Sequence, residues 1–325
     1  PPGWTSSAPK TWGQASERAA RFEIARAAAV EYHRDGSTLT DDSSGGRPAT
    51  YRYLHVVVDE AQDLRAAHWK MLRAMVEPGP NDLFIAGDTH QRIYDHQVSL
   101  GALGINIRGR SSRLTLSYRT TREILAYALR IAEGDKAVYD DLDDGIDQLT
   151  GYRSVLHGPT PNLTGYRNWS DELTGLGTLL KNWRDELSTD ATGALQDPAG
   201  NIAVAVTDHE ALTQVIEHLE KNHTGLTCAE LTKDGPRGNG EIHVGTMHRF
   251  KGLEYQRLAI IGVRKGALPR AYLDRYRKSD PQRYDHEQRK ARSLLFVAAT
   301  RARDELAISW NGTPSTLLDA VTDKR

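Results

Sequence analysis

The chain has 325 residues, of which 38% are hydrophobic and 26% charged, and its formal net charge is −1. This length allows two domains with separate cores, and the near-neutral charge excludes a polycation, so any contact with nucleic acid must come from a local basic surface. A single cysteine, Cys228, excludes an intrachain disulfide, and apolar stretches such as 258–263 are too short to span a membrane. We therefore expect a soluble protein of the cytoplasm with no membrane contact.

The first half of the chain predicts alternating helices and strands. Residues 14–34 are rich in Ala, Glu and Arg and predict a helix, which a polar, glycine-containing linker follows. A Thr-x-x-Glu capping box at Thr120 and Glu123 predicts the start of a helix, whereas the Asp, Gly and Pro content of 133–170 predicts mostly surface loop. The other expected elements are strands at 55–58, 83–86 and 113–116 and a helix over about 65–76.

The second half continues the alternation. A second capping box, from Thr207 to Glu210, predicts a helix that follows a strand at 201–206. The remaining expected elements are strands at 241–245, 257–262 and 305–310 and helices over about 171–187 and 285–299. Strands that alternate with helices predict an α/β fold with mostly parallel sheets, and the chain has room for two of them.

The stretch HVVVDEAQDL, at 55–64, combines an apolar strand with two adjacent carboxylates, Asp59 and Glu60. A continuous apolar run is typical of a parallel strand that is buried on both faces. Its C-terminal end is where α/β sheets bind ligands. An acid pair in that position commonly holds Mg²⁺ and polarises a water molecule in nucleotide hydrolases.

Four further motifs follow in order, and each combines an apolar segment with polar side chains. They are the loop GDTHQRIY with Gln91 (87–94), LTLSYRTTREI with Tyr118 and Arg119 (114–124), HVGTMHRFKGLEY (243–255), and LLFVAATRARDEL with Arg301 (294–306). The five motifs resemble, in this order, motifs II to VI of the UvrD/Rep family of superfamily 1 DNA helicases. The resemblance spans residues about 51 to 312.

The resemblance implies two RecA-like P-loop NTPase domains with parallel sheets. The first would be N-terminally incomplete and occupy 51–112, after an N-terminal helix and flexible linker at 1–50. The second would occupy 113–325, and too few residues lie between Arg119 and Thr246 for the large insertion subdomain of UvrD and Rep. The implied activity of the parent protein is ATP-dependent translocation on, or unwinding of, DNA, 3′ to 5′ by family analogy.

The resemblance also implies roles for residues that would contact ATP. Asp59 would hold Mg²⁺, Glu60 would orient and deprotonate the attacking water, and Gln91 would sense the γ-phosphate. Arg119 and Arg301 would stabilise the charge that develops in phosphoryl transfer, and would reach the nucleotide across an interdomain cleft. The implied nucleotide-binding residues are Tyr118, which would stack on adenine, Gly252, and Glu254, which would contact the ribose and phosphate side.

Single-stranded DNA is the implied polymer partner. Thr246, His248, Lys251 and Tyr94 would contact it, the first two through its backbone. The family usually continues after GDTHQRIY with a tryptophan and an arginine that meet DNA, whereas this chain has an acidic residue followed by His96. A carboxylate beside a phosphate backbone is unfavourable, which weakens the DNA contact expected at this point.

The sequence contains no phosphate-binding loop of the form Gly-x4-Gly-Lys-Ser/Thr. The nearest segment, at Lys10-Thr11, has Pro9 in place of the second glycine and no preceding strand. Either the loop belongs to a missing N-terminal Walker A segment of a parent protein, or a natural protein has lost it. The chain alone is expected to be inactive.

Two other functions compete with the helicase interpretation. A non-catalytic nucleic-acid-binding or assembly module could retain the RecA-like shape, although such a module has no use for a water-activating acid and two arginine fingers. A nuclease of the helicase-linked kind would need an acid cluster, and the sequence has none with suitable spacing.

Overall fold

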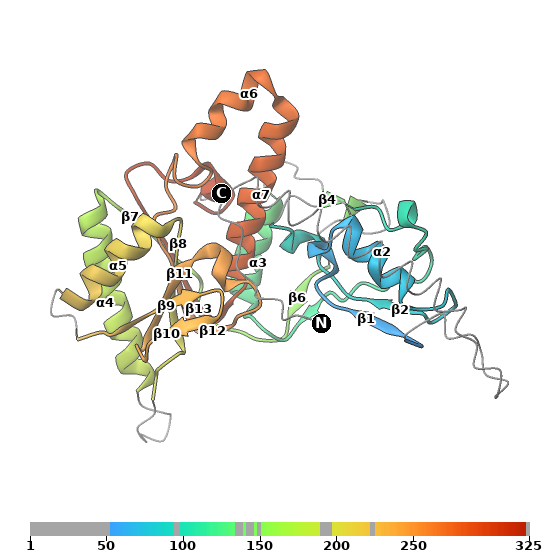
Figure 1. Cartoon of the computed structure of the whole chain (residues 1–325). Coiled ribbons are helices and arrows are strands. Elements are labelled where there is room, and N and C mark those ends of the chain that lie inside the picture. The colour runs from blue at the N-terminus through green and yellow to red at the C-terminus, as the bar shows by residue number, and fades with distance from the viewer. Residues whose placement is uncertain are drawn as a thin grey trace, which may run out of the picture. The chain divides into compact units, whose positions relative to one another are not determined.

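The computed structural model describes residues 53–93, 98–133, 139–140, 146–147, 151–188, 197–221 and 225–322, and Figure 1 shows its elements. The described residues divide into two compact units: 53–89, 98–111 and 140 form the first, and the other described residues form the second. The helix expected at 14–34 and the expected DNA contact Tyr94 lie outside the described residues. Within the described ranges, no helix is both long and apolar enough to cross a membrane.

The first unit contains two short parallel strands joined through a helix. Strand β1 (Val56–Val58) pairs with β2 (Leu83–Ile85) in the register Val57↔Phe84, and α2 (Ala66–Ala74) lies between them in sequence. Trp69 of α2 is almost fully buried in the core of this unit. The 3-10 turns of this unit are η2 (Ala61–Asp63) and η4 (Gly101–Leu103), and η3 (Thr89–Gln91) falls in sequence at the boundary with the second unit.

The second unit is built on a seven-stranded sheet, as far as the chain is described. Its strand order is β10-β9-β11-β8-β12-β13-β7, and every neighbouring pair is parallel except β10 and β9. The strands are β7 (Asn162–Tyr166), β8 (Ile202–Val206), β9 (Cys228–Thr232), β10 (Gly235–Arg237), β11 (Ile242–Thr246), β12 (Tyr255–Ile260) and β13 (Ala302–Asn311).

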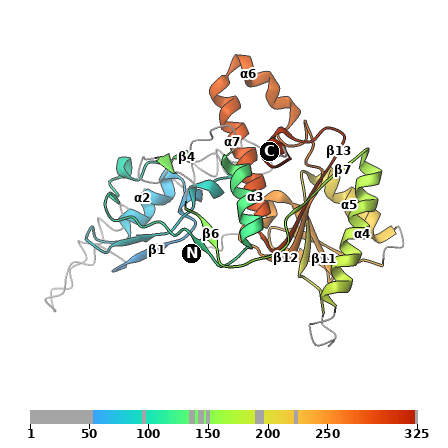
Figure 2. The ribbon, with the colours of Figure 1, turned by 180° about the vertical axis from the view of Figure 1, so that it is seen from behind.

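Helices cover both faces of this sheet, as Figures 1 and 2 show. Alternate residues of β8 point to opposite faces: Val204 packs with α4 (Trp169–Leu187) and α5 (His209–Lys221). Ala203 packs with α3 (Arg122–Glu133) and α7 (Pro281–Ala299) on the other face. The central strands are therefore buried on both sides, which explains their continuous apolar sequences.

A helical arm projects from the sheet of the second unit, as Figures 1 and 2 show. It comprises η6 (Ala271–Arg275), α6 (Tyr276–Ser279) and the N-terminal half of α7. The remaining elements of the described chain are short. They are β3 (Leu116–Ser117), β4 (Tyr139–Asp140), β5 (Ile146–Asp147), β6 (Arg153–Ser154), η5 (Met247–Phe250), η7 (Thr316–Leu318) and α8 (Asp319–Thr322).

A buried carboxyl group fastens α4 to the sheet. Glu172 has no exposed surface, and its Oε1 accepts hydrogen bonds from the Gly262 backbone N–H at 2.8 Å and the Ser309 hydroxyl at 2.6 Å. Its Oε2 accepts one from Nδ2 of Asn311 at 2.6 Å. Hydrogen bonds satisfy both oxygens, so the cost of burying this polar group is offset.

The predicted α/β fold with a mostly parallel sheet is confirmed. The expected strand at 113–116 is wrong in extent, because β3 has only two residues, and the expected loop at 133–170 contains the edge strand β7. The sequence patterns also missed β9 and β10, which carry few consecutive apolar residues. Strands β10 and β7 lie at the sheet edges, where less apolar sequence is needed because the outer side is not paired. Strand β9 is paired on both sides, but only alternate residues of it are buried.

Both expected capping boxes are one residue out of register. The hydroxyl of Thr121, rather than that of Thr120, accepts the hydrogen bond from the Ile124 backbone N–H at the start of α3. The Thr120 hydroxyl instead donates to the carbonyl of Ala302 at 2.6 Å. At α5 the capping acceptor is Asp208, which receives the Ala211 N–H at 2.9 Å. Both helices still begin with a side-chain cap.

Candidate nucleotide and nucleic-acid site

In the first unit, the two predicted catalytic acids follow β1 directly. Asp59 is exposed, and its Oδ1 accepts the backbone N–H of Glu60 at 2.8 Å. Glu60 has φ 51° and ψ 40°, the left-handed region, and is the one non-glycine residue with positive φ in the described chain. A side chain in this conformation costs about 1–2 kcal/mol, and such strain is concentrated at functional sites.

Gln62 connects the acid pair to the end of the second strand. Its Nε2 donates to Oε2 of Glu60 at 2.5 Å, and its Oε1 accepts the backbone N–H of Asp88 at 2.9 Å. A Cβ on Gly87 would lie 2.9 Å from that Oε1 and 3.0 Å from the Ala61 side chain, so this close approach requires glycine. Gln62 is almost fully buried and was not among the predicted site residues, although it lies within the motif DEAQD.

One acidic side chain of the first unit, that of Asp59, fits the expected magnesium ion. In the described part of the chain, no three His, Cys, Asp or Glu side chains gather as a metal site. Mg²⁺ does not require such a cluster, because it is usually held by one or two carboxylates together with substrate phosphates and water. The exposed carboxylate of Asp59 can serve as that ligand, whereas Oε2 of Glu60 already receives a hydrogen bond.

In the second unit, two predicted site residues, Arg301 and Lys251, contact a third, Gln91. Arg301 is 2% exposed, and its Nη2 donates to Oε1 of Gln91 at 3.1 Å, while its Nε donates to the Val297 carbonyl at 3.1 Å. Nζ of Lys251 donates to the backbone carbonyl of Gln91 at 3.3 Å. Residues from three separate motifs are therefore in direct contact, and a planar guanidinium is held in one orientation.

A second contact joins the motif around Arg119 to the motif that follows β11. Nε of Arg119 lies 3.1 Å from Oε2 of Glu254, and both side chains are about half exposed. Tyr118, beside it, is 70% exposed and presents its ring to solvent. The turn that carries Glu254 passes through Gly252, whose φ of 81° favours glycine.

The residues predicted to contact DNA differ in their exposure. Thr246 ends β11 and is only 7% exposed, whereas His248 is in the exposed part of η5. Desolvation of the His248 ring, with the positive charges of Lys290, Arg249 and Arg270, lowers the pKa of His248 below its usual 6.5. His248 therefore lies at a basic surface and is mainly neutral at pH 7.

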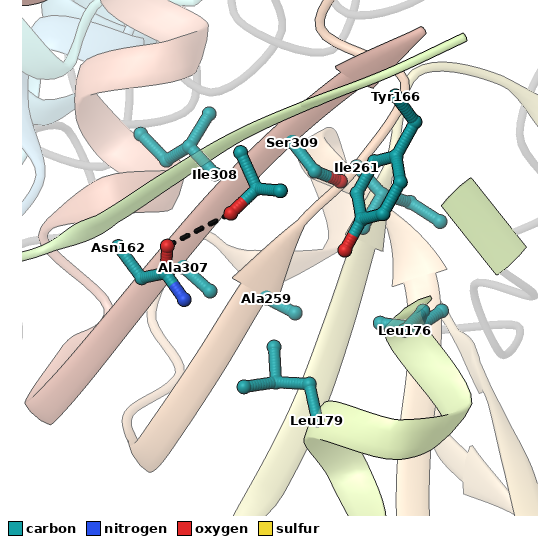
Figure 3. A pocket seen from close by; sticks show the side chains of 10 residues that line it. Asn162, Tyr166, Leu176, Leu179, Ala259, Ile261, Ala307, Ile308 and Ser309 are labelled. Carbon is teal, nitrogen blue, oxygen red and sulfur yellow. Dashed lines mark hydrogen bonds between the residues drawn. The ribbon is translucent and has the colours of Figure 1, made fainter. Parts of the chain in front are cut away.

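Figure 3 shows a cavity that is separate from these residues. It lies between α4 and the strands β7, β12 and β13, and its lining includes Tyr166, Leu176 and Ser309. The Thr164 hydroxyl donates to Oδ1 of Asn162 at 2.8 Å at its edge. A cavity of about 40 Å³ has room for water but not for a nucleotide.

Comparison with known proteins assigns both parts of the chain to one class. Residues 27–100 match the UvrD/REP helicase N-terminal domain, and residues 201–313 match the UvrD-like helicase C-terminal domain. Parallel α/β units with acids after one strand, and an arginine that contacts an amide, are consistent with RecA-like helicase domains. The chain belongs to the UvrD/Rep-like helicases.

Two individual proteins are similar to parts of this chain. "Putative ATP-dependent DNA helicase YjcD" of Bacillus subtilis (strain 168) is 28% identical over 114 residues, which cover 35% of this chain. The chain spans 14% of the length of that relative. The C-terminal domain of a possible DNA helicase from Lactobacillus plantarum WCFS1 has a TM-score of 0.41 and 17% identity, covering 63% of this chain and 94% of that structure.

Proposed function

We propose that this chain is the motor-core portion of an ATP-dependent DNA helicase or translocase, in which ATP hydrolysis is coupled to 3′ to 5′ movement on single-stranded DNA. The observation that carries the proposal is the part-buried hydrogen bond between the buried Arg301 and the Gln91 amide. An amide that senses a terminal phosphate and an arginine that stabilises the transition state must act on the same few atoms, so their direct contact fits these roles.

The acids of the first unit supply the groups for attack on the γ-phosphate. Glu60 would orient a water molecule and accept its proton, and the hydrogen bond from Gln62 supports this role because it orients the Glu60 carboxylate. Asp59 would hold Mg²⁺, which, when bound with ATP, neutralises charge on the phosphate oxygens.

The arginines of the second unit supply positive charge. Arg301 is fixed by two hydrogen bonds, whereas Arg119 is half exposed and contacts Glu254 through Nε, which leaves its two Nη groups for a ligand. Arg119 would bind a phosphate oxygen when ATP is present, and the exposed ring of Tyr118 would stack on the adenine. Glu254 and Gly252 would bind the ribose and phosphate side of the same nucleotide.

DNA would bind through its backbone at His248 and Lys251, with Thr246 and Tyr94 as further contacts. Backbone binding predicts an affinity that falls steeply with salt and does not depend on base sequence. A titration with two unrelated oligonucleotides at several salt concentrations tests this, and a strong preference for one of them would contradict it.

The decisive experiment measures DNA-stimulated ATP turnover in a form of the protein that also carries a Gly-x4-Gly-Lys-Thr segment. Arg301→Ala and Arg119→Ala should each lower turnover by on the order of 10³ or more, with nucleotide affinity largely retained. Arg303→Ala is the matched control, because Arg303 pairs with its neighbour Asp304 on the same strand. Loss of affinity and turnover in equal measure would make either arginine structural.

The absence of a Gly-x4-Gly-Lys-Ser/Thr loop from the 325 residues favours a second candidate, a non-catalytic module that binds nucleic acid. Both candidates predict that the 325-residue chain alone does not hydrolyse ATP. They differ once the loop is supplied: the helicase gains turnover that Glu60→Gln abolishes, whereas the module gains none.

A further inference from the structure

The helical arm of the second unit, with the segment that leads into it, concentrates positive charge. Residues 264–292 contain ten Lys or Arg and four Asp or Glu, a net charge of +6 in a chain whose total is −1. Most of these residues are exposed. A local excess of this size, projecting from the body of the unit, attracts polyanions.

Three arginines of the arm stack on tyrosine rings rather than pair with carboxylates. The guanidinium carbon of Arg283 lies 4.2 Å from the ring centroid of Tyr276, and that of Arg275 lies 4.7 Å from the same ring. Nη2 of Arg275 also donates to the Tyr276 hydroxyl at 2.6 Å. On the second helix of the arm, the Tyr284 ring lies 5.5 Å from the guanidinium of Arg277.

These stacks orient the arginines without neutralising them. Among the described residues, Arg275, Arg277 and Arg283 have no carboxylate within 4 Å, unlike Arg257, which pairs with Glu186 and Glu305. Stacking on a ring leaves the N–H edge of a guanidinium open to phosphate oxygens and reduces the side-chain entropy lost on binding. The charges are distributed over the three helical elements η6, α6 and α7, which suits a ligand with several phosphates along its length.

The base of the arm adjoins the proposed DNA contact at His248. Arg270 and Lys290, at the two ends of the arm, are close enough to lower the pKa of His248. We propose that the arm, through Arg275, Arg277 and Arg283, is an additional binding surface for the sugar-phosphate backbone of single-stranded DNA that continues from the His248 site. This inference rests on the DNA-binding part of the proposed function.

The experiment uses the 325-residue chain and fluorescently labelled oligo-dT, with affinity measured by anisotropy over a series of salt concentrations. The arm variant carries Arg275→Gln, Arg277→Gln and Arg283→Gln, all at exposed positions. We expect at least a tenfold loss of affinity, and a salt dependence that is shallower by about 2 in log–log slope, since each lost phosphate contact on a single strand removes about 0.7.

A matched control separates the effect of the arm on affinity from the effect of net charge. Lys221→Gln, Lys233→Gln and Arg237→Gln remove three exposed charges from other parts of the second unit, and should change the affinity less than twofold. Tyr276→Ala tests preorganisation without a change of charge. It should weaken binding several-fold, whereas Tyr276→Phe, which keeps the ring, should weaken it less.

The outcomes distinguish failure of the arm proposal from failure of the proposed function. If the wild-type chain binds oligo-dT and the arm variant matches the charge control, the arm proposal is wrong and the proposed DNA site stands. If the wild-type chain does not bind single-stranded DNA at low salt, both are wrong. Circular dichroism of each variant must match the wild type, and a variant that unfolds is replaced by the single substitution Arg283→Gln.

Discussion

Nη2 of Arg301 donates a hydrogen bond to Oε1 of Gln91 at 3.1 Å, although the two residues are 210 positions apart in sequence. One residue follows α7 and the other lies in the turn after β2. The contact joins two of the family motifs within the second unit. It also provides a way to test the site through stability, without nucleotide.

We expect the two side chains to be coupled energetically. In a double-mutant cycle with Arg301→Ala and Gln91→Ala, the summed effects of the single changes on the free energy of unfolding should differ from that of the double change by about 0.5–3 kcal/mol. Urea unfolding measures all four proteins. Arg303→Ala is the control, because Arg303 contacts Asp304 instead. Its effect on the free energy of unfolding should simply add to the effect of Gln91→Ala.

Glu60 should be a position where stability and function conflict. Glu60→Gly removes the strain of a left-handed non-glycine residue, whereas Glu60→Ala removes the carboxylate and retains the strain. Because neither variant can accept the hydrogen bond from Gln62, their difference isolates the backbone. The glycine variant should be more stable by about 1 kcal/mol, and equal unfolding midpoints would show that the backbone rearranges.

The carboxyl group of Glu172 should be essential to the stability of the second unit. Glu172→Ala leaves the Gly262 N–H, the Ser309 hydroxyl and the Asn311 amide without their acceptor, and we expect a loss of about 3 kcal/mol or more. Glu172→Gln keeps one acceptor oxygen and should lose less. Exposed Glu217 on α5 is the control: Glu217→Ala should change the unfolding free energy by no more than about 0.5 kcal/mol.

DNA affinity should rise as the pH falls below 6.5, because a bound phosphate favours the protonated form of His248. The gain begins as the pH falls through the pKa that His248 has in the complex, and it is complete once the pH is below the lowered pKa of the free chain. Anisotropy between pH 7.5 and 5.5 should show several-fold tighter binding for the wild type and a smaller change for His248→Gln.

The lowered pKa of His248 has the opposite effect on folding. The unfolded chain takes up the proton first, so the contribution of His248 to stability is present above pH 6.5 and decreases as the pH falls through that value. The wild-type chain must therefore remain folded, by circular dichroism, at each pH of the titration. A pH dependence that His248→Gln retains in full would assign the effect to other groups.

The sequence predicted the central strands and the motif order, but not the contacts between motifs. Residues 202–206 and 255–260 form strands because their apolar runs fit a sheet buried on both faces. Nothing in the local sequence indicates that Gln91 meets Arg301, since this depends on how distant segments pack. The same is true of Glu172, whose position in a helix resembles that of any exposed glutamate until its three partners are known.

The positive charge of the arm could have been counted from the sequence, but its organisation could not. The tyrosines at 272, 276 and 284 are interleaved with arginines, and the pairing of Arg277 with Tyr284 depends on the turn between α6 and α7. Loop-rich sequence at 151–166 gave no sign of the edge strand β7, because its partner is at 302–311.

The strand order in the sheet of the second unit also determines which strand edges of a nascent chain stay unpaired during translation. In the described sheet, β7 pairs only with β13, and β12 has β13 as one of its two neighbours. A nascent chain that has emerged only as far as the arm therefore presents two unpaired strand edges, at 162–166 and 255–260. Long-range parallel pairing of this kind forms slowly and is prone to aggregation until the last strand arrives. Translation through residues 261–311 is thus an interval in which both edges stay unpaired.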